Sequence, residues 1–274
     1  MNKTKIEEIE FDLLLEAIYQ SYGYDFRDYA PASLKRRIRK CMNDLDVKTI
    51  SAFQDKILHE TKSFTQLLNT ISVDVTSMFR DPDFFLTIRE KIFPAIRQLP
   101  FIRIWHAGCS TGEEIYSMAI LLKEEKLYDK ARIYATDMNE TVLAKAKDGI
   151  FSLKNIKEYI SNYHKAGGNA DFTEYYTAKC DHAIMKPALK NNVVWAQHNL
   201  VTDGSFNEFD IILCRNVMIY FNQPLQEHVH KLFIDSLAVG GVLGLGKKES
   251  LHLMPCQENY KVIDERVKLF KRIK

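Results

Sequence analysis

The first 70 or so residues carry apolar side chains at the spacing of helices and show no strand pattern. In IEEIEFDLLLEAIYQ apolar positions recur three or four residues apart: Ile6, Ile9, Leu13 and Ala17. In SAFQDKILHE, Phe53 and Ile57 follow the same spacing. Apolar residues repeated with a period near 3.6 line one face of an amphipathic helix. The pattern predicts a small helical module whose boundary lies between about 70 and 90.

From about residue 100 the pattern changes to short apolar runs that alternate with amphipathic runs. Segments typical of strands and segments typical of helices follow one another in this order: FIRIWHA, EEIYSMAILLKEEK, ARIYATD, ETVLAKAK, NVVWAQHN, EFDIILCRN, PLQEHVHKLFIDSLAVGG and VLGLGK. Such alternation predicts βαβ units and a mostly parallel sheet with helices on both faces, the α/β fold class.

Two stretches break this alternation. The segment YKVIDERVKLFKRI has the pattern of two strands joined by the polar turn DER, which predicts an antiparallel hairpin at the edge of the sheet. Between about 150 and 190, the segment NYHKAGGNADFTEYYTAKCDHAIMK combines a glycine pair with short aromatic runs. This segment predicts a small β insertion.

Length and composition fit an organisation in two parts. The chain has 274 residues, and we expect a helical domain over 1–75 and an α/β domain over 76–274, with the β insertion at about 155–190. At 46% hydrophobic and 27% charged residues the composition is ordinary for a globular chain. The net charge of +2 gives no global reason to expect nucleic-acid binding, so any electrostatic function must be local.

The cysteines and the apolar runs bear on where the protein works. The five cysteines are scattered, without a CxxC pair or a histidine cluster at metal-ligand spacing, so we expect a reducing compartment and no metal site. The start MNKTKIEEIEFD is polar and acidic, and no apolar run approaches the roughly 18 residues of a membrane span. We expect a monomeric cytoplasmic protein that meets membranes only through a partner.

The segment AGCSTGEE, residues 107–114, lies between a predicted strand and a helix predicted to begin at about Glu113. In an open α/β sheet this is the crevice where ligands bind, and glycines let the backbone approach the ligand closely. The segment is not the GxGxxG of dinucleotide enzymes, and Glu113 and Glu114 at the helix start would repel a phosphate. Acids at this place suit a cationic group such as an α-ammonium.

The next predicted strand, ARIYATD, ends in Asp137, which follows Gly112 by 25 residues. A carboxylate at this strand end can accept hydrogen bonds from both hydroxyls of a ribose. Recognition of an ammonium and a ribose without a pyrophosphate site points to S-adenosylmethionine rather than NAD. The alternative is that Glu113 and Glu114 cap their own helix and Asp137 caps the next one.

Two later strand ends add candidate residues to this crevice. The segment WAQHNL ends a strand at Asn199, where the amide side chain or the Leu200 backbone can contact an adenine amino group. The segment IILCRNVMIYF ends a strand at Cys214 and leaves Arg215 and Asn216 exposed over the same crevice. Alternatively, the two asparagines are ordinary turn residues.

Five motifs in this order are similar to a known family. The segments TSMFRDPDFF, AGCSTGEEIYSMAI, ATDMNETVLAKAKDGIF, HNL and FDIILCRNVMIYF together resemble the chemotaxis receptor methyltransferases of the CheR family. The resemblance implies a class I S-adenosylmethionine-dependent methyltransferase fold, Rossmann-like, with an amino-terminal helical docking domain and a small inserted β subdomain. It also implies a protein-glutamate O-methyltransferase that forms methyl esters on receptor cytoplasmic helices and releases S-adenosylhomocysteine.

By motif position the resemblance assigns cofactor contacts to eight residues: Thr76, Arg80, Glu113, Asp137, Asn199, Leu200, Arg215 and Asn216. One departure stands ahead of these residues, because Asp74 lies where some relatives carry Asn. A cofactor contact at position 74 is therefore not among the expectations.

Methyl transfer from a sulfonium to a glutamate needs no general base, because a carboxyl with a pKa near 4.3 is an anion at pH 7. The site has to orient the acceptor and remove water from it. Arg80 and Tyr220 are the candidate catalytic residues: Arg80 can approach the cofactor carboxylate or the substrate anion, and the Tyr220 hydroxyl can position the acceptor. The alternatives are a surface ion pair for Arg80 and a packed aromatic for Tyr220.

The segment PASLKRRIRKCMNDL predicts a helix with an apolar stripe of Leu34, Ile38, Cys41 and Leu45. Five cations spread over the rest of this helix, with no acid among them: Lys35, Arg36, Arg37, Arg39 and Lys40. We expect this face to dock an acidic receptor helical bundle, with a merely solvated face as the alternative. No nucleic-acid partner is expected, because the chain lacks the (D/N)PPY motif of amino-methylating DNA methyltransferases.

Several alternatives to receptor methylation remain open at this point. One is a class I methyltransferase with another acceptor, and another is a cofactor-binding docking module without turnover. A dehydrogenase is disfavoured by the acids after the glycine loop and by the carboxy-terminal hairpin. The insertion at about 160–190 can in addition offer a strand edge to an extended receptor tail, although edge strands are usually silent.

Overall fold

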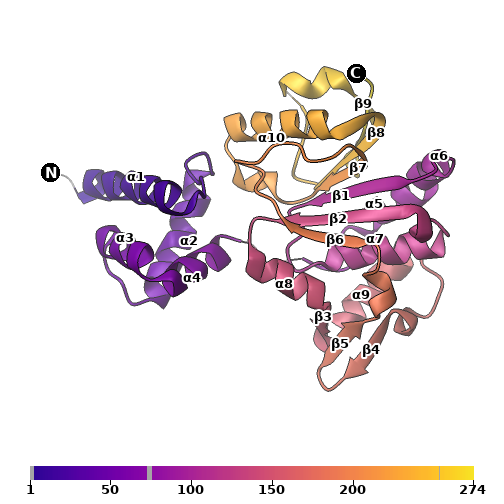
Figure 1. The fold of residues 1–274 in the computed structure, drawn as a ribbon, viewed down its shortest axis with the longest axis horizontal. Coiled ribbons are helices and arrows are strands. Elements are labelled where there is room, and N and C mark those ends of the chain that lie inside the picture. The colour runs from indigo at the N-terminus through magenta and orange to yellow at the C-terminus, as the bar shows by residue number, and fades with distance from the viewer. Residues whose placement is uncertain (1–2, 73–75, 253) are drawn as a thin grey trace. The chain divides into compact units, whose positions relative to one another are not determined.

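The computed structural model describes residues 3–72, 76–252 and 254–274, in which the chain divides into two units (Figure 1). The helical unit comprises the described part of Met1–Val73, with Val201–Asp203 and Tyr220–Val229. The sheet unit comprises the described part of Asp74–Leu200, with Gly204–Ile219 and His230–Lys274.

The helical unit confirms the predicted helical module. Its helices before residue 73 are α1 (Lys3–Tyr22), α2 (Pro31–Asp44), α3 (Ile50–His59) and α4 (Thr61–Ile71). Helix α3 begins after Thr49, whose side-chain hydroxyl accepts a hydrogen bond from the Ala52 amide and so satisfies a free N–H of the first turn. As predicted, Phe53 and Ile57 of α3 are fully buried.

The sequence analysis chose the wrong face of α1 as the apolar face that packs against the protein. Ile6, Ile9 and Leu13 are 39%, 44% and 56% exposed. A second set of apolar residues at the same helical spacing is buried in their place: Phe11, Leu14, Leu15 and Ile18. Both sets satisfy the period of a helix, so the spacing alone could not decide which face packs against α3.

Helix α2 buries the predicted stripe apart from its last member. Leu34, Ile38 and Cys41 are buried, whereas Leu45 follows the helix as its C-cap and is partly exposed. Pro31 occupies the first turn, where a missing N–H costs no intrahelical hydrogen bond.

The sheet unit contains the predicted parallel sheet. Its seven strands lie side by side in the order β6-β2-β1-β7-β8-β10-β9. Pairs among the first five strands are parallel, and β10 runs antiparallel to both β8 and β9. The bounds are β1 (Ile102–Ala107), β2 (Ala131–Asp137), β6 (Val193–Gln197), β7 (Phe209–Cys214), β8 (Leu237–Leu245), β9 (Tyr260–Asp264) and β10 (Leu269–Arg272). The expected edge hairpin is therefore confirmed as β9 and β10.

Helices cover both faces of this sheet, as the alternating pattern predicts. In Figure 1, α7 (Glu113–Glu124) and α8 (Glu140–Asp148) lie along one face and α10 (Gln223–Ser236) along the other. Phe233 of α10 packs edge to face on Trp105 of β1, with ring centroids 5.6 Å apart. Ahead of the sheet lies a continuous helical segment, formed by α5 (Pro82–Thr87), a π-helical turn (Ile88–Ile92) and α6 (Phe93–Ile96). The resulting architecture is Rossmann-like.

The predicted β insertion is present between β2 and β6. Three antiparallel strands in the order β3-β5-β4 form it: β3 (Ile150–Ser152), β4 (Tyr176–Lys179) and β5 (His182–Met185). It also contains α9 (Ile156–Lys165), which the sequence analysis did not predict. The signal for α9 was available, because its buried residues Ile156, Tyr159 and Tyr163 follow a helical spacing.

Short 3-10 turns connect these elements at Tyr128–Lys130, Leu153–Asn155, Phe172–Tyr175, Pro187–Leu189, Met218–Tyr220 and Pro255–Asn259. The five cysteines are free thiols. Among residues 3–72, 76–252 and 254–274, the structure contains no helix with the length and apolar character needed to cross a bilayer.

A buried histidine in α10 makes stability depend on pH. His230 is 1% exposed, and its Nδ1 has no hydrogen-bond partner in the described part of the chain. Burial lowers the pKa of His230 to about 4, from 6.5 in an exposed imidazole. The folded state therefore holds this side chain neutral at pH values where the unfolded state already binds a proton.

We predict that this difference destabilises the protein in acid. Above pH 6.5 the contribution of His230 is constant, and between pH 6.5 and 4 the free energy of unfolding falls by about 3 kcal/mol in total. Urea unfolding of wild type and His230→Leu at pH 7.5 and 5 measures this effect, which the variant should lose. The control His228→Leu replaces an exposed histidine of the same helix and should keep the wild-type slope. Equal slopes for all three proteins would contradict the prediction.

Candidate active site

The candidate site lies along the edge of the sheet where the parallel strands end. The carboxyl ends of β2, β1, β7 and β8 are neighbours in the sheet, so the segments that follow them meet at one edge. These segments contain the glycine loop Gly108–Gly112, Asp137, the pair Arg215 and Asn216, and residues 246–249. All of them belong to the sheet unit.

The backbone conformation and the close packing of the glycine loop both require glycine at two positions. Gly108 and Gly112 have φ angles of 80° and 90°, which favour glycine. A Cβ on Gly112 would lie 2.9 Å from the Ala146 Cβ, and one on Gly108 would lie 2.6 Å from a Val217 methyl. The sequence analysis attributed these glycines to a ligand that approaches closely, and the structure adds that protein atoms already require them.

Asp137 stands at the end of β2, as predicted, and its carboxylate is held by two backbone amides. Oδ2 accepts a hydrogen bond from the Ser110 amide at 2.9 Å, and Oδ1 accepts one from the Asn139 amide at 3.0 Å. The N-cap of α8 is Asn139, whose side chain accepts a hydrogen bond from the Thr141 amide. The helix cap is therefore Asn139, and the alternative in which Asp137 caps this helix is wrong.

Glu113 begins α7, as predicted, and its side chain is buried with a residue exposure of 6%. Its carboxylate accepts hydrogen bonds from the Thr111 hydroxyl at 2.6 Å and from the Tyr159 hydroxyl at 3.4 Å. Burial and the nearby Glu113 carboxylate together raise the pKa of Tyr159. The N-cap of α7 is Gly112, which has no side chain, so Glu113 is a buried carboxylate beside the loop rather than a cap.

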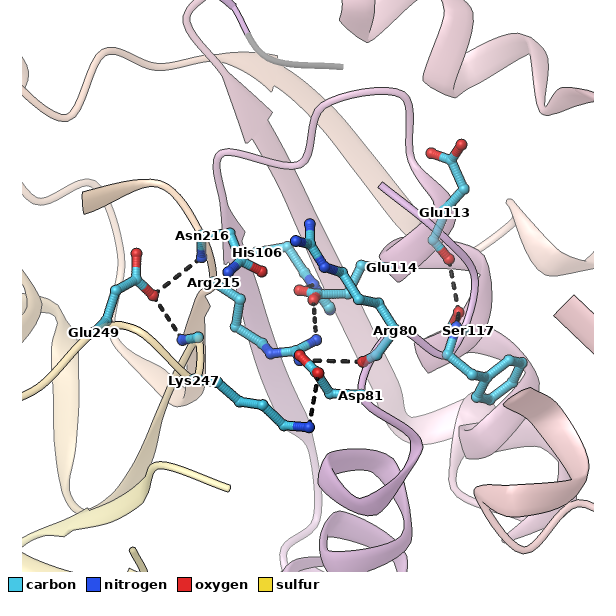
Figure 2. A network of polar contacts seen from close by, with 12 residues as sticks. Arg80, Asp81, His106, Glu113, Glu114, Ser117, Arg215, Asn216, Lys247 and Glu249 are labelled. Carbon is cyan, nitrogen blue, oxygen red and sulfur yellow. Dashed lines mark hydrogen bonds and ion pairs between the residues drawn. The ribbon is translucent and has the colours of Figure 1, made fainter. Parts of the chain in front are cut away.

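Glu114 faces the protein instead of a ligand, which corrects the expectation that both acids suit a cationic ligand group. Its Oε2 accepts a hydrogen bond from Arg215 Nη1 at 2.8 Å, and its Oε1 lies 2.9 Å from His106 Nδ1 (Figure 2). Burial acts to raise the pKa of Glu114, but the Arg215 and His106 partners outweigh it and lower the pKa to about 2. Glu114 is thus an ionised internal partner.

Arg215 is buried, whereas the sequence analysis expected it to be exposed over the crevice. Its side chain is 2% exposed, and its guanidinium also donates to Asp81 Oδ2 at 2.7 Å and to the Arg80 carbonyl at 3.1 Å. The same guanidinium lies over the Phe84 ring, 4.0 Å from its centroid. A buried cation needs such partners, and they leave it embedded beneath the site.

Arg80 is placed by a backbone that its neighbours hold in an uncommon conformation. The residues on either side, Phe79 and Asp81, have φ angles of 52° and 57°, which cost energy outside glycine. The Ser117 hydroxyl accepts a hydrogen bond from the Phe79 amide at 2.8 Å, and Lys247 pairs with Asp81 at 2.9 Å. Figure 2 shows the Lys247 side chain directed at Asp81, the residue after Arg80. Sequence reasoning missed Lys247, and it missed Ser117 although this residue lies within the segment AGCSTGEEIYSMAI.

Three of the remaining candidates of the sheet unit follow strand ends, with Asn199 and Leu200 after β6 and Asn216 after β7. Strand β6 ends at Gln197, so Asn199 lies two residues beyond the strand instead of at its end, which corrects that prediction. Leu200 is 7% exposed, and Asn216 has a φ of 62°. Thr76 is partly buried in an irregular segment, and Asp74 lies outside the described residues.

Tyr220 and Arg37 come together in the helical unit. The Arg37 guanidinium lies 4.2 Å from the centroid of the Tyr220 ring and donates a hydrogen bond of 2.5 Å to the Ile71 carbonyl. With an exposure of 7%, Arg37 is not part of an exposed basic face, and that expectation is wrong. Its position on α2 faces α4, which supplies the carbonyl acceptor. A catalytic role for Tyr220 stays a prediction.

The other four cations of α2 are less buried. Arg36, Arg39 and Lys40 are exposed, and Lys35 is partly buried with its ammonium 4.9 Å from the centroid of the Phe11 ring. Arg39 pairs with Glu7 of α1 at 2.5 Å. One cation of α2 is therefore paired with a carboxylate of α1.

Comparisons with known proteins agree with this architecture. Residues 74–268 match the family described as CheR methyltransferase, SAM binding domain, and residues 9–72 match CheR methyltransferase, all-alpha domain. The Putative methyltransferase Cher3 of Pseudomonas putida is 46% identical over 99% of this chain and 100% of its own. The Chemotaxis protein methyltransferase of Listeria innocua is 26% identical over 90% of this chain and 92% of its own. The Chemotaxis protein methyltransferase of Salmonella typhimurium is 27% identical over 89% of this chain and 85% of its own.

The Rossmann-like sheet, the glycine loop and the carboxylate at the end of β2 define an S-adenosylmethionine-dependent methyltransferase of class I. The chain belongs to the CheR methyltransferase family.

The residues at the sheet edge fit S-adenosylmethionine. Asp137 presents an oriented carboxylate that suits ribose hydroxyls, and the buried carboxylate of Glu113 suits an ammonium. The hydroxyl oxygen of Ser110 is buried in the loop between them and has no hydrogen-bond partner in the described structure. Because buried polar atoms are nearly always paired, this hydroxyl is suited to a polar ligand.

We predict that Glu114→Gln destabilises the sheet unit at pH 7 by about 2 kcal/mol or more, because it takes one charged partner from the buried Arg215. The pKa of Glu114 is about 2 in the folded state and 4.5 in the reference state, so its contribution is present above pH 4.5 and is lost as the pH falls through 2. The difference between the proteins should therefore shrink in acid.

Urea unfolding at pH 7 and at acid pH measures this difference. The matched control Glu90→Gln removes an exposed carboxylate from the segment that precedes the sheet and should unfold like wild type. Equal stability of Glu114→Gln and wild type at pH 7 would mean that the buried ion pairs contribute nothing net.

Proposed function

We propose that this protein transfers a methyl group from S-adenosylmethionine to glutamate side chains of methyl-accepting chemotaxis receptors, forming methyl esters and S-adenosylhomocysteine. The observation that carries the proposal is the placement of Arg80 beside the cofactor edge, where an uncommon backbone, a hydrogen bond from the buried Arg215 to the Arg80 carbonyl and the ion pair of Lys247 with Asp81 hold it. Relatives over nearly the whole chain are named chemotaxis protein methyltransferases, which supports the receptor as acceptor. The proposal includes that the protein acts in the cytoplasm, where the cytoplasmic helices of such receptors lie, and that it acts as a monomer.

The proposed reaction is an in-line displacement on the methyl carbon. The cofactor supplies a methyl group on a sulfonium, and the glutamate oxygen forms the new bond as the carbon–sulfur bond breaks. The acceptor is already ionised at neutral pH, so the protein supplies orientation and exclusion of water. In this scheme Asp137 binds the ribose hydroxyls, Glu113 holds the ammonium, and Arg80 orients the acceptor carboxylate. Contacts from Thr76, Asn199, Leu200 and Asn216 complete the proposed cofactor set.

The receptor surface in this proposal is the exposed part of the basic helix α2. Arg36, Arg39 and Lys40 are exposed, and an acidic helical bundle complements them in charge. Arg37 is excluded because its guanidinium is buried against Tyr220 and Ile71. Long-range attraction of this kind raises the rate of encounter with a large anionic partner.

The test of the proposal is transfer of radiolabelled methyl from S-adenosylmethionine to receptor-containing membranes, followed by mild base. Release of volatile labelled methanol shows a carboxyl methyl ester and supports the proposal. Retained label shows a nitrogen- or carbon-linked product and supports a methyltransferase with another acceptor. Cofactor binding without any label supports a docking module without turnover.

We predict that Asp137→Ala weakens S-adenosylmethionine binding by about 1–3 kcal/mol, the scale of a lost charge-assisted hydrogen bond in a partly buried site. Calorimetric titration of the cofactor measures the change. The control Asp129→Ala removes an exposed carboxylate just before the other end of the same strand and should bind like wild type. Unchanged binding in Asp137→Ala would remove this residue from the cofactor site.

We predict that the double variant Arg36→Glu and Lys40→Glu slows receptor methylation by about tenfold or more and leaves cofactor affinity unchanged. The matched control reverses Lys261 and Lys271, which are exposed and face each other across β9 and β10, so it changes the net charge equally. The rate of methyl ester formation is measured at low and high salt. Equal slowing in both double variants would show that net charge, and not the face of α2, matters.

A further inference from the structure

A buried glutamate that no sequence motif singled out joins two segments of the candidate site. Glu249 follows β8 and is 5% exposed. Its carboxylate accepts four backbone hydrogen bonds, two at each oxygen. Oε2 accepts from the amides of Gly246 at 2.6 Å and Asn216 at 3.0 Å, and Oε1 accepts from those of Val217 and Met218, both at 2.9 Å.

These four donors come from the segments that follow two neighbouring parallel strands. Gly246 comes directly after β8, whereas residues 216–218 come after β7, and Cys214 pairs with Leu245 at the ends of these strands. Burying a carboxylate is costly unless its acceptor positions are filled, and here four oriented amides fill them. Glu249 thus fixes the segment after β7 relative to the end of β8. Figure 2 shows its carboxylate directed at this segment.

The fixed segment in turn shapes the glycine loop. Asn216 has a φ of 62°, a conformation that a non-glycine residue keeps only when its surroundings hold it. The next residue, Val217, packs against Gly108 so closely that a Cβ there would lie 2.6 Å from the valine methyl. Glu249, the segment 216–218 and Gly108 therefore form a continuous line of contacts from the end of β8 to the cofactor loop.

We propose that Glu249 is a positioning residue for the S-adenosylmethionine site. It acts through the backbone of residues 216–218, which sets the place of the Asn216 side chain and supports the glycine loop at Gly108. The inference rests on the proposed cofactor contact of Asn216 and deepens the proposed function. A site whose loops are held in the bound geometry avoids the cost of ordering them when the ligand binds.

The test measures dissociation constants for S-adenosylmethionine and S-adenosylhomocysteine by calorimetry, together with unfolding midpoints. Glu249→Gln keeps the side-chain length but turns an amide nitrogen toward backbone donors, and it should weaken both ligands by about tenfold or more. Val217→Ala keeps the four amide bonds of Glu249 and removes a partly exposed side chain that packs on Gly108. It should fold and should weaken binding several-fold.

Two controls separate positioning from general stability. Glu258→Gln removes an exposed carboxylate from the segment that follows and should bind and unfold like wild type. Ile102→Val removes one methylene from a fully buried residue at the opposite end of β1, so it should lower the unfolding midpoint and leave both dissociation constants unchanged.

The outcomes are distinguishable. Weaker binding in Glu249→Gln and Val217→Ala, with wild-type binding in both controls, supports the inference. Wild-type affinity in Val217→Ala, or in Glu249→Gln despite a lowered midpoint, overturns it and leaves Glu249 a structural residue. Equal weakening in Ile102→Val also overturns it. A wild-type protein that binds neither ligand contradicts the proposed function itself.

Discussion

The buried guanidinium of Arg215 is the constraint on which the site depends. Its charge must be matched inside the protein, and two carboxylates and a carbonyl from two separate segments match it. These segments are the start of α7 and the residues around Arg80, and Arg215 ties both of them to the end of β7. Because none of them can move without exposing an unpaired charge, the cation fixes their relative places.

A second buried charge at the same edge is satisfied in another way. Glu114 is paired with the guanidinium of Arg215, whereas Glu249 is held by backbone amides, whose partial charges are fixed by the fold. Burial raises the pKa of Glu249, and the four amide donors oppose that rise. This edge of the sheet therefore holds two kinds of buried carboxylate. Glu114 is in an ion pair that is lost when the carboxylate is protonated, whereas the backbone amides that bind Glu249 do not titrate.

Much of this arrangement follows from local sequence signals. The strand ends at Asp137 and Cys214 and the helix start at Glu113 were predictable because strand and helix periods change there. The buried face of α1, the burial of Arg37 and the inward direction of Glu114 were not, since each depends on which neighbour packs against it. Ser117, Lys247 and Glu249 were missed for the same reason, because each pairs with a residue 30 or more positions away, which is Phe79, Asp81 and Met218 respectively.

The place of β10 within the sheet sets an order on synthesis. Residues 269–272 pair with β8 on one side and with β9 on the other, although β9 precedes them in the chain. While a ribosome is still making this region, β8 has an open edge and β9 has no partner in the sheet. Both gain this neighbour only when β10 has emerged, so the pairing of β9 with the sheet waits for a strand that is translated after it.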